Sequence, residues 1–220
     1  LSNGKVEMKY MTAKEEDILT NQNYIRKGVV IDKLLKSLII SNINYDDLIV
    51  GDRNAILIAA RILGYGKDYE FQYKGEEVSI DLTELETQYI DESSLTQGVN
   101  EFSFILPHTK TPITYKLLTN QDERKVEAEV KGLKKINKQA SPELSTRLKH
   151  TITSVNGEAE NKDIRDFVDN HMLARDSRAF REHIKKTQPD IKMQFSHNGI
   201  NSVEEDATVP MTAGFFWPDA

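Results

Sequence analysis

The stretch from residue 45 to residue 66 constrains the fold most, because it contains a nearly unbroken apolar run. Between Ala55 and Leu63 only Arg61 is polar. A helix that is apolar nearly all round is normally buried among other elements, and this run is far shorter than the roughly 20 residues that cross a bilayer. Asp52 can cap the beginning of the helix, and Gly64 can end it. We therefore expect a buried central helix and no membrane span.

Charged side chains at both ends of this helix need partners if they are buried. A buried arginine is costly unless a carboxylate or several hydrogen bonds compensate it, and Asp46 and Asp47 precede the helix. The candidates for an internal ion pair that fixes the orientation of the helix are Asp52, Arg53 and Arg61.

The remaining periodic segments divide into helices and strands. Thr12 and Glu15 form a capping-box pattern, and the polar run that begins at Thr119 is a second helix start. Together with helical spacing, such patterns predict helices over residues 13–19, 29–40, 119–137, 141–154, 161–171 and 176–187. Alternation of apolar and polar residues predicts a hairpin over 69–82 and two further strands over 102–106 and 113–117. Four strands in succession favour one small antiparallel sheet. The expected class is α+β, mostly helical, with a small antiparallel β-sheet inserted in the middle.

This pattern predicts three segments. The expected divisions are 1–66 for an N-terminal strand and helices including the central helix, 67–118 for the β insertion, and 119–220 for charged helices and an aromatic tail.

Charge and cysteine content exclude several functions. The net charge is -6 and the sequence pI is about 5.5, which disfavours binding to duplex nucleic acid because such domains are usually basic. The chain has no cysteine, so it can form no disulfide, thiol nucleophile or thiolate metal site. The first twenty residues lack the apolar run of a signal peptide, although a chain beginning at Leu1 leaves room for earlier residues.

No catalytic, cofactor or metal site is predicted, and we expect the protein not to be an enzyme. The five histidines show no i, i+4 pair with the helical glutamate of a zinc hydrolase. Gly64-Tyr65-Gly66 lacks the Lys-Ser/Thr of a phosphate loop, and no Gly-x-Ser-x-Gly elbow is present. The paired acids Asp46-Asp47 and the run 15–17 are typical of helix N-termini.

Two features are candidates for contacts with a partner. Charges alternate in sign over two helical pieces, which suits a pairing surface between subunits and a solvated face equally well; these residues are Arg165, Asp169, Arg175, Asp176, Arg178 and Arg181. The second feature is the tail Phe215-Phe216-Trp217, whose large aromatic side chains must bury against some surface. The tail either folds back on its own chain or fills a pocket of a neighbour.

Four stretches, taken in order and spacing, resemble one protein family. They are residues 11–19, residues 50–66, Lys116–Thr119 with Asp122-Glu123, and Phe215–Pro218. The family is the baseplate protein family of contractile-tailed phages, typified by a baseplate hub protein of T-even phages, and the resemblance covers residues 8–218. It implies a late, structural or assembly component of the tail baseplate hub, and it supplies no catalytic residues.

The resemblance also implies where the protein acts and with what. The expected partners are other baseplate or hub proteins and further copies of this chain, first in the host cytoplasm during assembly and then in the tail baseplate of the virion. Two alternatives stay open. One is a transient assembly chaperone of the hub that is absent from the mature virion, and the other, with less support, is a baseplate-associated hydrolase that uses Asp or Glu carboxylates.

Overall fold

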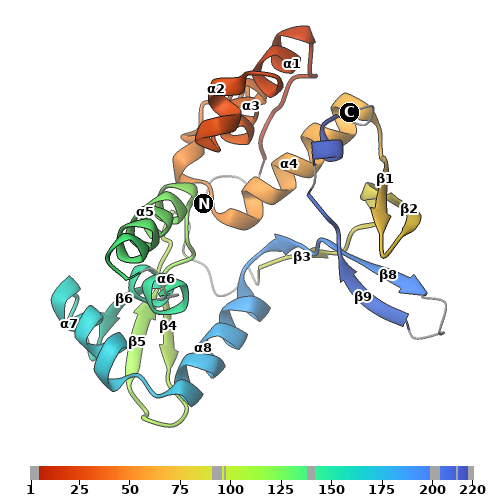
Figure 1. Ribbon diagram of the computed structural model, residues 1–220. Coiled ribbons are helices and arrows are strands. Elements are labelled where there is room, and N and C mark those ends of the chain that lie inside the picture. The colour runs from red at the N-terminus through yellow and green to blue at the C-terminus, as the bar shows by residue number, and fades with distance from the viewer. Residues whose placement is uncertain are drawn as a thin grey trace. The chain divides into compact units, whose positions relative to one another are not determined.

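A computed structural model describes residues 5–90, 96, 98–137, 142–198, 204–211 and 213–217. The chain folds into two compact units, each built from separate stretches (Figure 1). Unit 1 contains Asn44–Val50 and Tyr89–Gln188, and unit 2 contains Lys5–Ile43, Gly51–Gln88 and the chain from Pro189 onward. Helices and several small antiparallel sheets confirm the α+β class. The units do not coincide with the three predicted segments, because each unit draws on more than one of them.

The helices of unit 2 carry buried apolar side chains, among them Leu19, Leu34 and Leu35. These helices are α1 (Ala13–Leu19), α2 (Gln22–Lys27), α3 (Val30–Leu38) and α4 (Val50–Tyr65), the last belonging to unit 2 from Gly51 onward. The predicted capping box opens α1, where Thr12 and Glu15 bond to each other's backbone. The predicted central helix is confirmed as α4, whose Ile56, Leu57 and Ile58 are buried. No helix in the described ranges is both long and apolar enough to cross a membrane.

Within the described residues, the strands of unit 2 form three two-stranded antiparallel sheets. β1 (Asp68–Tyr73) pairs with β2 (Glu76–Asp81), β3 (Thr87–Gln88) with β7 (Asp190–Ile191), and β8 (Gln194–Asn198) with β9 (Glu204–Thr208). A 3₁₀ turn, Leu82–Glu84, follows β2, and another, Ala213–Phe215, lies in the tail. The aromatic face of β1 meets β8, since Phe71 packs edge-on against Phe195 with ring centroids 5.2 Å apart.

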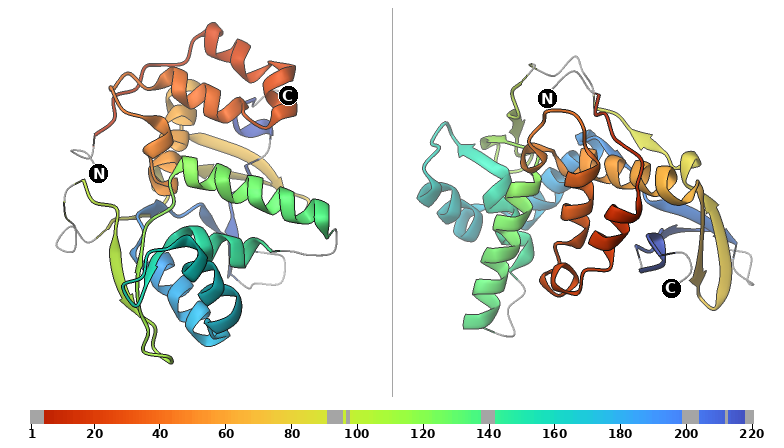
Figure 2. Two further views of the ribbon diagram at one scale, coloured as in Figure 1. Left: turned by 90° about the vertical axis from the view of Figure 1, so that its left-hand side faces the viewer. Right: turned by 90° about the horizontal axis from the view of Figure 1, so that it is seen from above.

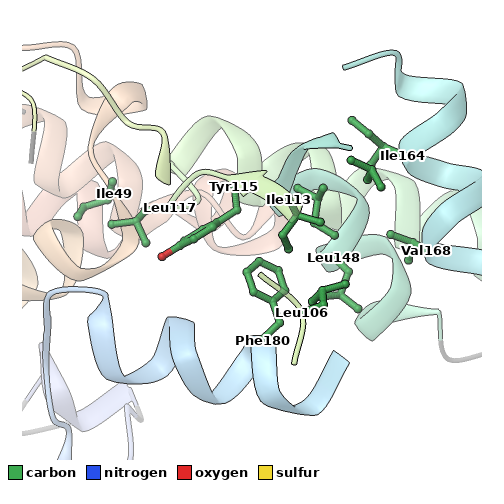
Figure 3. Packing of buried hydrophobic residues seen from close by; sticks show 11 residues of the cluster. Ile49, Leu106, Ile113, Tyr115, Leu117, Leu148, Ile164, Val168 and Phe180 are labelled. Atoms are coloured by element: carbon green, nitrogen blue, oxygen red, sulfur yellow. The ribbon is translucent and has the colours of Figure 1, made fainter. Parts of the chain in front are cut away.

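Unit 1 packs helices against a three-stranded sheet. The sheet has the order β4 (Phe102–Ile105), β5 (Pro112–Tyr115), β6 (Ile152–Val155) and is antiparallel throughout. Its helices are α5 (Asn120–Ile136), α6 (Glu143–Thr151), α7 (Asn161–Asp166) and α8 (Ala174–Thr187), with a 3₁₀ turn at Tyr45–Asp47 and a π-helical turn at Phe167–His171. α5 and α6 lie side by side (Figure 2). Figure 3 shows the core between α8 and the sheet, with Leu106, Ile113 and Phe180 among its buried members.

The prediction of one four-stranded sheet in the middle of the chain is wrong. β1 and β2 form a sheet of their own in unit 2, whereas β4 and β5 belong to unit 1 and take β6 as their third strand. The sequence pattern assigned residues 152–154 to the end of a helix. Alternation identifies a half-buried strand but not its partner, and β6 joins β5 across an intervening stretch that includes α5 and α6.

Candidate functional site

Helix α8 has one buried face and one exposed face. Its buried residues are Asp176, Ser177 and Phe180. The Phe180 ring lies edge-on to Tyr115, with centroids 5.2 Å apart, and it points from the helix into the core of unit 1 (Figure 3). A ring of this size dominates the packing of the surface that it covers. The position of Phe180 therefore holds the opposite face of α8 toward solvent.

Two polar contacts fix the rotation of α8 about its axis. The carboxylate of Asp176, near the beginning of the helix, accepts the backbone N–H groups of His108 at 2.8 Å and Thr109 at 3.1 Å, in the turn that joins β4 to β5. At the other end, Nε2 of His183 lies 2.8 Å from the Tyr115 hydroxyl, and its ring stacks on Phe104 with centroids 4.4 Å apart. The turn of the hairpin thus lies beside the first turn of α8 (Figure 2).

These contacts also set the charge states of the two groups. Burial raises the pKa of Asp176, but the backbone N–H donors outweigh burial and the net pKa is lowered, because hydrogen bonds to the charged form favour it. Burial lowers the pKa of His183. Near neutral pH the buried face of α8 therefore carries an ionised aspartate and a neutral histidine.

The exposed face of α8 carries a row of arginines, which we call the α8 stripe: Arg175, Arg178 and Arg181. All three are exposed, and successive members are three residues apart, so they are neighbours on the helix surface. Arg178 donates to the Glu182 carboxylate at 2.9 Å, and the side chains of both residues are largely exposed to solvent. Lys185 and Lys186 are also exposed and extend the positive charge to the end of the helix.

The other charged residues of the predicted interface form ion pairs or hydrogen bonds inside unit 1. Arg165 donates two hydrogen bonds to Glu129 on α5, at 2.7 and 2.8 Å, and Glu129 also lies 2.9 Å from His150 on α6. The guanidinium of Arg165 holds the pKa of Glu129 at about 2. Asp169 pairs with Lys149 at 2.7 Å. The predicted surface therefore splits, with Arg165, Asp169 and Asp176 turned to internal partners and the α8 stripe turned to solvent.

The aromatic tail packs on its own chain, in unit 2. Phe215 and Phe216 are 1% and 2% exposed, and the Phe215 ring lies edge-on to Tyr69 of β1 with centroids 5.0 Å apart. The Tyr69 hydroxyl donates to the carbonyl oxygen of Pro210 at 2.8 Å. Trp217 is half-buried. Of the two alternatives for the tail, the structure has the one in which it folds back.

The predicted ion pair of Arg61 with an aspartate is wrong. Arg61 is buried and donates to the backbone carbonyls of Gly66 at 2.7 Å and Asp68 at 3.0 Å, just beyond the end of α4. Asp52 is nine residues earlier on the same helix, which is about 14 Å away at the rise of an α-helix. Asp52 has no ion pair within the described residues, and burial raises its pKa. Arg53 instead lies 3.5 Å from Asp32 of α3.

The acidic pairs considered for hydrolysis have structural partners. Glu15 is fully buried, and the hydrogen bond from Lys9 holds its pKa at about 2. Asp46 lies 2.8 Å from Arg124, and Asp47 accepts a hydrogen bond from Asn44 at 2.9 Å. The parts of the chain that the structure describes contain no group of three or more His, Asp or Glu that could hold a metal ion.

Sequence reasoning missed an acidic surface on the outer side of the β1–β2 hairpin. The register places Asp68 opposite Asp81, Glu70 opposite Ser79 and Gln72 opposite Glu77. We call the four carboxylates Asp68, Glu70, Glu77 and Asp81 the hairpin acidic face; the first three are exposed and Asp81 is half-buried. The signal was present, because the same alternation that buries Tyr69 and Phe71 sends the acids between them to the other side.

Comparisons of the chain with protein-family models, with curated proteins and with solved structures found no match.

Proposed function

We propose that this protein is a structural or assembly component of the tail baseplate hub of a contractile-tailed phage, and that it acts through protein–protein contacts. The resemblance of the four sequence stretches named above supports the baseplate assignment. The observation that carries the mode of action is the α8 stripe, a cationic surface on a helix whose rotation is fixed by Asp176, Phe180 and His183.

The fixed position of the stripe is what favours a contact role. Like charges three residues apart on a helix destabilise it by about 0.2–0.5 kcal/mol per pair, so an acidic partner that neutralises the stripe gains from relief of this repulsion. Because the supporting side chains are already ordered, a partner also has less conformational entropy to remove on binding.

The test is incorporation of the protein into phage particles. Purified virions and isolated assembling baseplates would be analysed by mass spectrometry for the wild-type chain and for the triple variant R175Q/R178Q/R181Q. We expect stoichiometric wild-type protein in both particles and at least a tenfold loss of the variant, roughly the effect of removing one close charged pair at a buried interface. The triple variant K131Q/K134Q/K135Q on the exposed side of α5 is the matched control and should incorporate normally.

The same measurement separates the alternatives. If the protein is present in assembling hubs and missing from virions, it is a transient chaperone and not a structural component. Absence from both particles would contradict the baseplate assignment. Degradation of cell walls by the purified protein, lost on substitution of a single carboxylate, would establish the hydrolase instead.

A further inference from the structure

Two faces of this protein, one in each unit, have opposite charge and similar length. From Arg175 to Lys185, the α8 stripe and its continuation extend about 15 Å along the helix axis. The hairpin acidic face extends along β1 from Asp68 to Gln72, or about 14 Å of strand. The net charge of -6 belongs to unit 2, because acidic and basic side chains are equal in number in unit 1.

Each face carries internal repulsion that a contact with the other face would relieve. On the hairpin, Asp68 lies directly opposite Asp81, and Glu70 lies diagonal to Glu77; like charges in these positions destabilise a strand pair. Lys67 pairs with Asp81 and lowers its pKa to about 2, which compensates the corner of the face at Asp81. On α8, Glu182 is paired with Arg178 and leaves the positive charge in excess.

The opposite sides of both elements are already occupied. Tyr69 and Phe71 pack against Phe215 and Phe195 beneath the hairpin, and Phe180 packs against Tyr115 beneath α8. Each element is therefore a supported surface whose charged side faces outward.

We propose that the protein self-associates, with the α8 stripe of one copy docked on the hairpin acidic face of a second copy. Because the two faces differ, the contact is heterologous: in a docked pair one copy keeps a free stripe and the other keeps a free acidic face, and each can bind a further copy. Repetition of such a contact produces a ring when the rotation closes and an open filament when it does not.

This inference rests on the proposed function only in that both assign the α8 stripe to protein contacts, and the two fail separately. Self-association is measured on the purified protein, whereas the baseplate assignment is measured on phage particles. If the purified protein is monomeric but its incorporation into virions depends on the stripe, the partner is not a second copy and the proposed function still holds.

The experiment is analytical ultracentrifugation of the full chain over a range of concentrations. The wild type should gain mass with concentration at about 0.05 M salt and remain monomeric at about 1 M, where the Debye length is only ~3 Å. The stripe variant R175Q/R178Q/R181Q and the face variant D68N/E70Q/E77Q should each associate at least tenfold more weakly when alone. The α5 variant K131Q/K134Q/K135Q should behave like the wild type.

Mixing the two neutralised variants gives the decisive readout. The stripe variant keeps its acidic face and the face variant keeps its stripe, so an equimolar mixture has one complementary contact and should form a heterodimer and nothing larger. A wild type that stays monomeric at low salt, or a mixture that stays monomeric, would overturn the proposal. So would salt-sensitive binding of a monomeric wild type to a random-sequence DNA duplex that the stripe variant loses, because the stripe would then be a nucleic-acid contact.

Discussion

Arg61 shows how a buried charge can be stabilised without a carboxylate. Its guanidinium donates to the Gly66 and Asp68 carbonyls at the end of α4, where the helix dipole concentrates partial negative charge. The rings of Tyr65 and Tyr69 lie 5.6 and 5.8 Å from its central carbon, within the range of cation–π attraction. Burial still lowers its pKa, and within the described residues its Nε has no hydrogen-bond partner.

Removal of this side chain should destabilise unit 2. We expect Arg61→Ala to lower the free energy of unfolding by about 2–4 kcal/mol, because two carbonyls lose charged donors and a cavity is left. Arg53→Ala is the control, since its partly exposed pair with Asp32 is worth less than about 1 kcal/mol. Urea denaturation of both variants measures the difference, and equal losses would contradict this account of Arg61.

His183 should make the stability of unit 1 sensitive to acid. Its pKa in the folded protein is lowered from the ordinary 6.5 by burial, so its contribution is fully present above pH 6.5 and is lost as the pH falls toward the folded value. The loss is limited to about 1.4 kcal/mol per pH unit for one proton. Urea titrations on both sides of pH 6.5 should give a smaller pH dependence for His183→Gln than for the wild type, and an unchanged dependence would rule out His183 as its source.

At the scale of elements, two helical glycines give opposite predictions. A Cβ on Gly51, in the first turn of α4, would lie 1.9 Å from the carbonyl oxygen of Pro189, which is a backbone atom and cannot move aside cheaply. A Cβ on Gly132 of α5 would meet nothing within 4 Å. Gly132→Ala should therefore stabilise the protein by about 1 kcal/mol, the difference in helix propensity.

Gly51→Ala should instead destabilise the protein by more than about 1 kcal/mol, since the steric conflict exceeds the propensity gain. Thermal unfolding of the two variants compares them directly. A stabilising Gly51→Ala would mean that the close approach of α4 to Pro189 is not maintained in solution.

At the scale of the whole molecule, the sequence predicted most helices and strands well but predicted poorly which strands pair with each other. The capping patterns at Thr12 and Thr119 correctly placed α1 and α5, because capping depends on residues only three positions apart. The strand β6 and the separation of the two hairpins were missed. Both depend on pairings between stretches far apart in the chain, about which local alternation carries no information.

The candidate site was predicted in part for the same reason. The sequence pointed to the region of Arg175, Arg178 and Arg181 through their alternation with acids. It could not show that Asp176 would turn inward to the hairpin turn or that Arg165 would pair with Glu129. Which charged residues pair inside unit 1 and which face solvent is decided by the packing of α5 and of the β4–β5 hairpin, which the sequence pattern does not show.

The two strands of the β3–β7 pair are synthesised before and after most of unit 1. Residues 89–188 lie between the two halves of that pairing, and a ribosome needs about 5–20 s to add roughly 100 residues. By the end of that interval all core residues of unit 1 have been added, Phe180 among the last of them, whereas unit 2 still lacks its last strands. Until Phe195 and Phe215 emerge, the aromatic side of the β1–β2 hairpin, which they cover in the finished fold, is open to water and to other nascent chains.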